Sequence, residues 1–223
     1  MKLGNVLFLL GLWVGGTAWA QGDAAKGAEK AKVCAACHGK EGVSANVIWP
    51  SLAGQNPKYT VKQLQDFKSG ARPNAVMKPQ ASLLSDEDMQ NVAAYYASLP
   101  PAQQATAGVG AEPAATLKLG EMLYRGGDMS KGIPACSACH GPAGEGIDPA
   151  AFPTLAGQQA AYSRAQLETF KNAATLAEQA SDVDLKKYVQ RPNDPNQMMQ
   201  DIARKMSPQQ IEAVSLYIQG LQH

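Results

Sequence analysis

The chain has 223 residues, a length that suits one large domain or two small ones. Apolar residues make up 45% of it but aromatic residues only 6%, so a buried cofactor is a candidate for the missing apolar volume of the core. Twenty basic and nineteen acidic residues give a net charge of +1, and this balance argues against nucleic acid as a partner.

The first twenty residues have the features of a secretory signal peptide. Lys2 gives a positive start, an apolar run covers Val6–Val14, and Ala18–Ala20 matches a cleavage site. An uncleaved membrane anchor is the alternative, but the apolar run is too short to span a bilayer comfortably. We therefore predict a signal peptide over 1–20 and a mature chain without a transmembrane helix.

The residues that follow predict a helical domain. Helices are expected at Gly27–Val33 and at Tyr59–Lys68, with Thr60 as the residue that opens the second one. A third is expected after Ser85, because Asp88 follows it in the manner of a helix start signal and apolar residues then recur at helical spacing. Strand patterns are absent from the sequence.

The second half of the chain repeats the first. Four separated blocks recur at offsets of 102 to 122 residues. The pairs are Cys34–Gly39 with Cys136–Gly141, Pro50–Gln55 with Pro153–Gln158, Tyr59–Lys68 with Tyr162–Lys171, and Met89–Leu99 with Ile211–Leu221. Such a repeat indicates a duplicated domain of about a hundred residues. Pro100 and Pro101 end the first copy, so we predict domains over 21–101 and 117–223 and a linker over 102–116.

The second copy carries the same helix signals. Leu117–Arg125 and Tyr162–Lys171 are predicted helices, the latter opened by Ser163. Ser207 with Gln210 three residues later predicts the start of the last helix. The whole chain is thus expected to be all-α.

Each copy contains Cys-x-x-Cys-His, the attachment motif of c-type haem. In Cys34–His38 and Cys136–His140 two cysteines can bond the two vinyl groups of one porphyrin, while the adjacent histidine supplies a neutral imidazole to the iron. Disulfides, a redox motif and zinc are the alternatives, but a thioredoxin-like motif requires a βαβ setting and zinc requires four ligands. We therefore predict two haem c groups, held by Cys34, Cys37, Cys136 and Cys139, with His38 and His140 on the irons.

The second axial ligand of each iron is predicted to be methionine. Only His223 remains beyond the two motif histidines, and it lies past the last helix, where solvent exposure is expected. The repeat selects Met77 and Met199, because each lies eight residues before the serine that starts the last helix of its domain. Met198 is the rival of Met199.

Four other methionines are predicted to pack in the core. Met206 aligns with Leu84 and Met89 with Ile211, whereas the first copy has no equivalent of Met122 or Met129.

A thioether ligand favours Fe(II) over Fe(III), and a six-coordinate iron has no room for oxygen or peroxide. Such sites can only gain and lose an electron.

Prolines after the motifs are candidates for orienting the axial histidines. Pro50 lies twelve residues after His38, and Pro153 lies thirteen after His140, so each proline carbonyl can accept a hydrogen bond from the imidazole. A plain turn proline is the alternative. Three further residues are candidates for contact with haem propionates, with surface solvation as the alternative for the arginines: Trp49, Arg72 and Arg191.

The chain has two tandem Cys-x-x-Cys-His motifs, each followed by Pro-x-Leu-Ala-Gly-Gln and by a predicted helix that carries Tyr, Gln-Leu and Phe. This combination resembles the cytochrome c4 family over 22–222. The resemblance implies two class I cytochrome c domains related by pseudo-twofold symmetry, each around one covalent haem. It also implies a periplasmic electron carrier, not an enzyme, that is loosely bound to the inner membrane and feeds terminal oxidases. The implied ligands are His38 with Met77 and His140 with Met199, and the implied proline role falls on Pro50 and Pro153.

Two other functions remain open at this point. The first is a cytochrome subunit of a flavoprotein dehydrogenase, such as one that oxidises sulfide, and the second is a dihaem peroxidase. Two His/Met sites and the lack of a spare internal histidine argue against the peroxidase. The segment between Phe170 and Met199 has about twenty more residues than its counterpart, and Ser181–Asn196 is predicted to be an exposed loop that shapes a partner surface.

Overall fold

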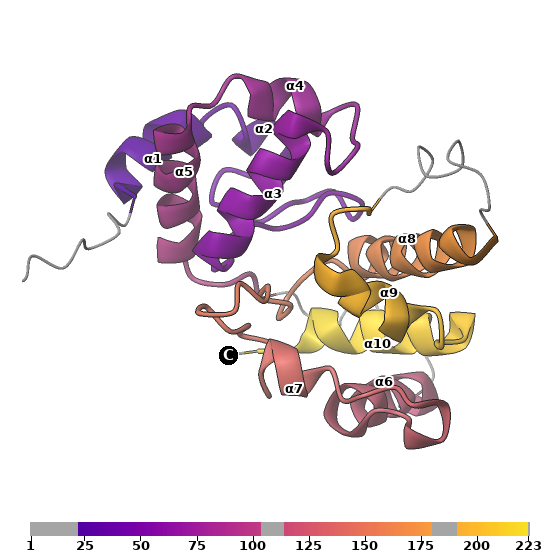
Figure 1. Ribbon diagram of the computed structural model, residues 1–223. Helices are drawn as coiled ribbons and strands as arrows, with labels where there is room; N and C mark the ends of the chain where they lie inside the picture. The colour runs from indigo at the N-terminus through magenta and orange to yellow at the C-terminus, as the bar shows by residue number, and fades with distance from the viewer. Residues whose placement is uncertain (1–21, 104–113, 180–190, 223) are drawn as a thin grey trace, which may run out of the picture.

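The computed structural model describes residues 22–103, 114–179 and 191–222 (Figure 1). In these ranges the chain is helical, and its extended pairings are two isolated bridges, Asp128 with Ile133 and Ile147 with Phe152. The all-α prediction is confirmed. None of the helices in these ranges has the length and apolar character that a membrane crossing requires. The predicted signal peptide, most of the predicted linker and His223 lie outside the described residues, so the domain limits stay predictions.

The first domain contains α1 (Ala24–Ala31), α2 (Ala35–His38), α3 (Pro57–Ser69), α4 (Met77–Ser82) and α5 (Asp86–Ser98). The predicted capping box is present at α5, where Ser85 and Asp88 each bond the other's backbone amide. The prediction that Thr60 opens α3 is wrong. Asn56 caps that helix by accepting from the amide of Tyr59, and the Thr60 hydroxyl donates back to the Asn56 carbonyl inside the first turn.

The second domain contains α6 (Ala114–Gly126), η2 (Met129–Lys131), α7 (Ser137–His140), α8 (Ala160–Gln179), η4 (Pro195–Gln197), α9 (Met198–Ala203) and α10 (Pro208–Gly220). Ser207 and Gln210 form the predicted capping box of α10. Ser163 does not open α8, since it is the fourth residue of that helix. The helix also continues past its predicted end at Lys171, because residues 172–179 contain neither glycine nor proline.

Each domain is built on a close crossing of its first and last long helices, α1 on α5 and α6 on α10 (Figure 1). A glycine permits each crossing. A Cβ at Gly27 would lie 1.9 Å from the carbonyl oxygen of Asn91, and a Cβ at Gly120 would lie 2.2 Å from that of Ala213. Any side chain at these positions would therefore push the paired helices apart.

The substitution Gly120→Ala is expected to lower the free energy of unfolding by about 1–3 kcal/mol, because the added methyl group overpacks the α6–α10 crossing. Guanidinium unfolding of the haem-loaded protein measures this loss. Gly126→Ala is the matched control in the same helix, since its Cβ meets no atom within 4 Å. We expect the control to be neutral or to gain up to about 1 kcal/mol. Equal effects of the two substitutions would contradict the crossing as the cause.

The methionines divide between core and surface. Met89 is 0% exposed and Met206 is 2% exposed, so their predicted core positions are confirmed. Met122 and Met129 are 58% and 82% exposed, and the prediction that they pack in the core is wrong. Helix α6 turns its other side inward, where Leu123 is buried, and Met129 lies in the short η2 turn.

Candidate functional site

The two Cys-x-x-Cys-His motifs form matching one-turn helices, α2 and α7, and none of their four cysteines is paired in a disulfide. Burial raises the pKa of Cys34, and it raises the pKa of Cys136 to about 11. A redox Cys-x-x-Cys needs a thiol with a lowered pKa, so this environment argues against a thioredoxin-like role. Within the described residues there is no group of three or more histidine, cysteine or carboxylate side chains placed to hold a metal ion.

Both motif histidines are buried and held by a proline carbonyl. Nδ1 of His38 lies 2.8 Å from the carbonyl oxygen of Pro50, and Nδ1 of His140 lies 3.0 Å from that of Pro153. A carbonyl only accepts, so Nδ1 must carry the proton. Burial lowers the pKa of both histidines and keeps the rings neutral. Each ring therefore keeps a free lone pair on Nε2, the form that binds iron.

The candidate methionine ligands lie at the starts of α4 and α9. Met77 is the first residue of α4, whereas α9 begins with Met198 and then Met199. Ala81 and Ala203 fix the alignment, since both are 0% exposed and each lies four residues before the capping serine of the next helix. Counted from these alanines, Met77 aligns with Met199. Met198 is 39% exposed, whereas Met77 and Met199 are both half-buried.

Two buried arginines occupy equivalent positions in the two domains. Arg72 is 8% exposed and Arg191 is 6% exposed, so the surface-solvation alternative is wrong. The guanidinium carbon of Arg72 lies 4.5 Å from the ring centre of Phe67, and that of Arg191 lies 4.4 Å from the ring centre of Phe170. Stacking on an aromatic ring stabilises a desolvated guanidinium. Asp194 is also buried. The prediction of an exposed loop over Ser181–Asn196 is therefore wrong for Arg191 and Asp194, and 181–190 lie outside the described residues.

The two guanidiniums meet where the domains touch. Arg72 Nη2 donates to Tyr162 Oη at 3.2 Å and to Gln166 Oε1 at 2.8 Å, and Arg191 Nη1 donates to the same Gln166 Oε1 at 2.6 Å. Burial raises the pKa of Tyr59, but the charges of Arg191 and Arg72 outweigh it and leave that pKa below its ordinary value. The interface here is a buried region of positive potential.

The residues present fit haem c. Two cysteines per motif that form no disulfide, beside a neutral imidazole with an available Nε2, suit the porphyrin and its iron. Buried Nε of Arg191 finds no hydrogen-bond partner among the described residues. A buried, incompletely paired guanidinium fits a carboxylate such as a haem propionate, to which it can donate two hydrogen bonds.

Sequence reasoning missed the polar groups around these arginines. Gln63 accepts from Arg72 Nη1 at 2.9 Å, Tyr162 accepts from Arg72 across the interface, and Gln166 accepts from both arginines. The available signal was the repeat, because Tyr and Gln recur at matching positions of the block that forms α3 and α8. Trp49, the third propionate candidate, is 36% exposed.

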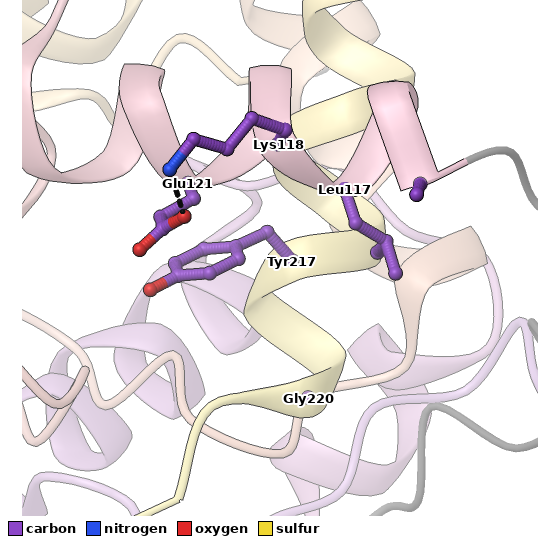
Figure 2. Close-up of a pocket in the computed structure, with 6 residues that line it drawn as sticks. Leu117, Lys118, Glu121, Tyr217 and Gly220 are labelled. Carbon is purple, nitrogen blue, oxygen red and sulfur yellow. Dashed lines mark hydrogen bonds and ion pairs between the residues drawn. The ribbon is translucent and has the colours of Figure 1, made fainter.

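A pocket of about 360 Å³ lies between α6 and the end of α10, away from all of these residues (Figure 2). Its lining residues are Ala114, Leu117, Lys118, Glu121, Tyr217 and Gly220. Lys118 donates to Glu121 at 2.8 Å, and Arg125 donates to the Tyr217 hydroxyl at 3.0 Å. None of the predicted haem-binding residues lines the pocket, and its polar groups satisfy one another, so it offers no set of groups arranged for catalysis.

Comparison with known proteins follows the same two-part division. The profile of the family described as Cytochrome c matches residues 120–222, and the profile described as Cytochrome C oxidase, cbb3-type, subunit III matches residues 22–95. Cytochrome c4 of Azotobacter vinelandii is 43% identical over 99% of this chain and 100% of its own length. A protein of Stutzerimonas stutzeri described as a thiosulfate dehydrogenase electron acceptor is 41% identical over 84% of this chain and 78% of its own.

A solved structure has the same arrangement. The crystal structure of reduced recombinant cytochrome c4 from Pseudomonas stutzeri superposes with a TM-score of 0.76 and 38% sequence identity. The match covers 90% of this chain and 100% of that chain. The similarity thus extends over both domains and their relative placement, and not over one domain alone.

Proposed function

The chain belongs to the cytochrome c4 family, and from this premise we propose that it is a periplasmic carrier that passes electrons between respiratory-chain components. It is an electron-transfer protein that binds haem c and is not an enzyme. Haem c supplies the one-electron oxidation and reduction of its iron. Everything else in the function depends on how the protein holds, orients and shields that group.

We assign the holding residues by motif and contact. Cys34 and Cys37 in the first domain, with Cys136 and Cys139 in the second, form the covalent attachments. His38 and His140 provide Nε2, and the carbonyls of Pro50 and Pro153 fix the ring planes. Met77 and Met199 would supply the second ligand of each iron, which would leave no position for water or peroxide.

The observation that carries this proposal is the pair of His–Pro hydrogen bonds. It occurs in both domains, at 2.8 and 3.0 Å, on histidines that are each 8% exposed. A buried, neutral imidazole with its Nδ1 proton tied to a backbone carbonyl is held in one orientation and one tautomer. Two such sites in one chain suit two closed redox centres.

Spectroelectrochemical titration of the mature protein tests the proposal. We expect two one-electron steps per chain, because each domain holds one haem c. The reduced protein should not bind carbon monoxide, and it should not turn over peroxide, since both irons would be six-coordinate with the proposed ligands. Carbon monoxide binding at half of the haems would instead indicate one open site and a dihaem peroxidase.

A second candidate concerns the electron donor. The 41% identity to a thiosulfate dehydrogenase electron acceptor favours thiosulfate oxidation as the source of electrons over the flavoprotein dehydrogenase that was left open as an alternative. Purified thiosulfate dehydrogenase with thiosulfate should then reduce this protein within seconds in stopped-flow mixing. Equal reduction of an unrelated class I cytochrome c would argue that the transfer is nonspecific. That result would favour the other proposed partners, a quinol-oxidising donor and a terminal oxidase as acceptor, with loose attachment of the protein to the inner membrane.

A further inference from the structure

Two glutamines bind across the domain interface in a reciprocal way. Gln158 of the second domain accepts from the amide of Ser51 through Oε1 and donates to the Ser51 carbonyl through Nε2, both at 2.9 Å. Gln55 of the first domain accepts from the amide of Thr154 at 2.9 Å and donates to its carbonyl at 3.0 Å. Each side-chain amide thus holds one backbone residue of the other domain by two hydrogen bonds.

The four partners are buried and their orientation is fixed. Ser51 and Thr154 are 4% and 6% exposed, and both glutamines are 8% exposed. Each Oε1 also accepts the amide of the residue that follows its own glutamine, at 2.8 Å in the first domain and 3.0 Å in the second. Because the atom that meets two N–H donors must be the oxygen, the side-chain amide can be oriented in one way only, with Nε2 facing the carbonyl.

These glutamines are linked to the histidines through a single peptide unit. The carbonyl of Pro50, which accepts from His38 Nδ1, and the amide of Ser51, which donates to Gln158 Oε1, belong to the same planar peptide. The peptide between Pro153 and Thr154 stands in the same relation to His140 and to Gln55. Hydrogen bonds connected through one peptide polarise each other, so an acceptor at the amide strengthens the carbonyl as an acceptor.

We propose that Gln158 and Gln55 are cross-domain positioning residues: each orients and polarises the peptide that holds the axial histidine of the opposite domain. This inference rests on the proposed function of the histidines as iron ligands. The electronic state of each site then depends on a side chain from the other half of the molecule. A stronger hydrogen bond at Nδ1 makes the imidazole a better donor and favours Fe(III), so loss of the glutamine should raise the potential of the opposite haem.

The variants Gln158→Leu and Gln55→Leu test the crossed relation in the haem-loaded, reduced protein. Histidine labelled with ¹⁵N gives separate Nδ1 signals, which backbone assignment attributes to His38 and His140. We expect Gln158→Leu to speed hydrogen exchange at His38 Nδ1 by roughly tenfold and to leave His140 unchanged, since one buried hydrogen bond changes opening by about that factor. Gln55→Leu should do the reverse, and each variant should raise one midpoint potential only.

Two further variants separate positioning from a general loosening of the interface. Asn193→Leu removes other cross-domain bonds, from Asn193 Nδ2 to Asp66 at 2.7 Å and to Gln63 at 3.2 Å, and should leave both histidine exchange rates unchanged. Gln158→Glu keeps an acceptor for the Ser51 amide in either protonation state and should retain slow exchange at His38. If Gln158→Leu does not fold, Gln158→Glu is the variant of this position that tests the inference.

The outcomes are distinct. Two results in either leucine variant would overturn the inference. One is faster exchange at both histidines, and the other is unchanged exchange at the histidine in the domain opposite the substituted glutamine. The labelled Nε2 signals of the unmodified protein test the underlying function separately. If they lack the shift of an iron ligand, the axial assignment fails, whereas the crossed pattern at Nδ1 still decides whether the glutamines act through the proline peptides.

Discussion

Replacing Met77 or Met199 by alanine is expected to remove about half of the near-infrared sulfur-to-iron charge-transfer absorption of the oxidised protein, because each is proposed to supply the thioether of one of two irons. The potential of the affected haem should also fall, since the soft donor that favours Fe(II) is lost. Absorption spectroscopy and redox titration of the purified variants measure both effects. No other substitution of a methionine should change the spectrum as much.

Met198→Ala and Met122→Ala are the matched controls. Met198 precedes Met199 but is 39% exposed, and Met122 is 58% exposed on α6. Both variants should keep the full charge-transfer band. A band that survives in Met199→Ala and is lost in Met198→Ala would shift the ligand by one residue, and with it the alignment counted from the buried Ala203.

Substituting leucine for Arg191 is expected to lower the free energy of unfolding by about 3–5 kcal/mol, because it leaves buried acceptors, and the propionate that we propose it binds, without their cation. Removal of a positive charge near the iron should also lower the potential of the nearest haem, since Fe(III) is then less disfavoured. Guanidinium unfolding and spectroelectrochemistry of the haem-loaded variant measure the two effects.

Arg164→Leu is the control for this prediction. Its guanidinium pairs with Glu212 at 2.6 Å, but its side chain is 48% exposed. An exposed ion pair of this kind contributes under about 1 kcal/mol, and no haem potential should move. If Arg191→Leu behaves like this control, the buried cation at the domain interface has no part in binding the propionates.

The capping serines and the His–Pro pairs could be predicted because the duplication gives each of them a counterpart in the other domain. The capping boxes at Ser85 and Ser207 lie where the local sequence places them, since a cap depends on residues three apart. The His–Pro hydrogen bonds also occur at the positions that the spacing predicted. These features are local in the chain or are repeated within it.

Burial was harder to predict, because it depends on what packs against a residue from elsewhere. Met122 and Met129 are exposed although their side chains suit a core, and Arg191 is buried although its side chain suits a surface. The start of α3 was missed for another reason. Asn56 followed by Pro57 is a strong local signal of a helix start, but it lies before the repeated block Tyr59–Lys68 on which the prediction was based.

The reciprocal amide contacts also bear on how such a molecule can arise. Gln55 and Ser51 lie in one domain, and Gln158 and Thr154 lie in the other. Each domain therefore carries both a glutamine that binds the other domain and the peptide that the other domain's glutamine binds. A surface with both members is self-complementary, which is the condition for an isologous dimer with twofold symmetry. The contact that joins two domains of this chain is therefore one that two identical single-domain chains could make before their genes were fused.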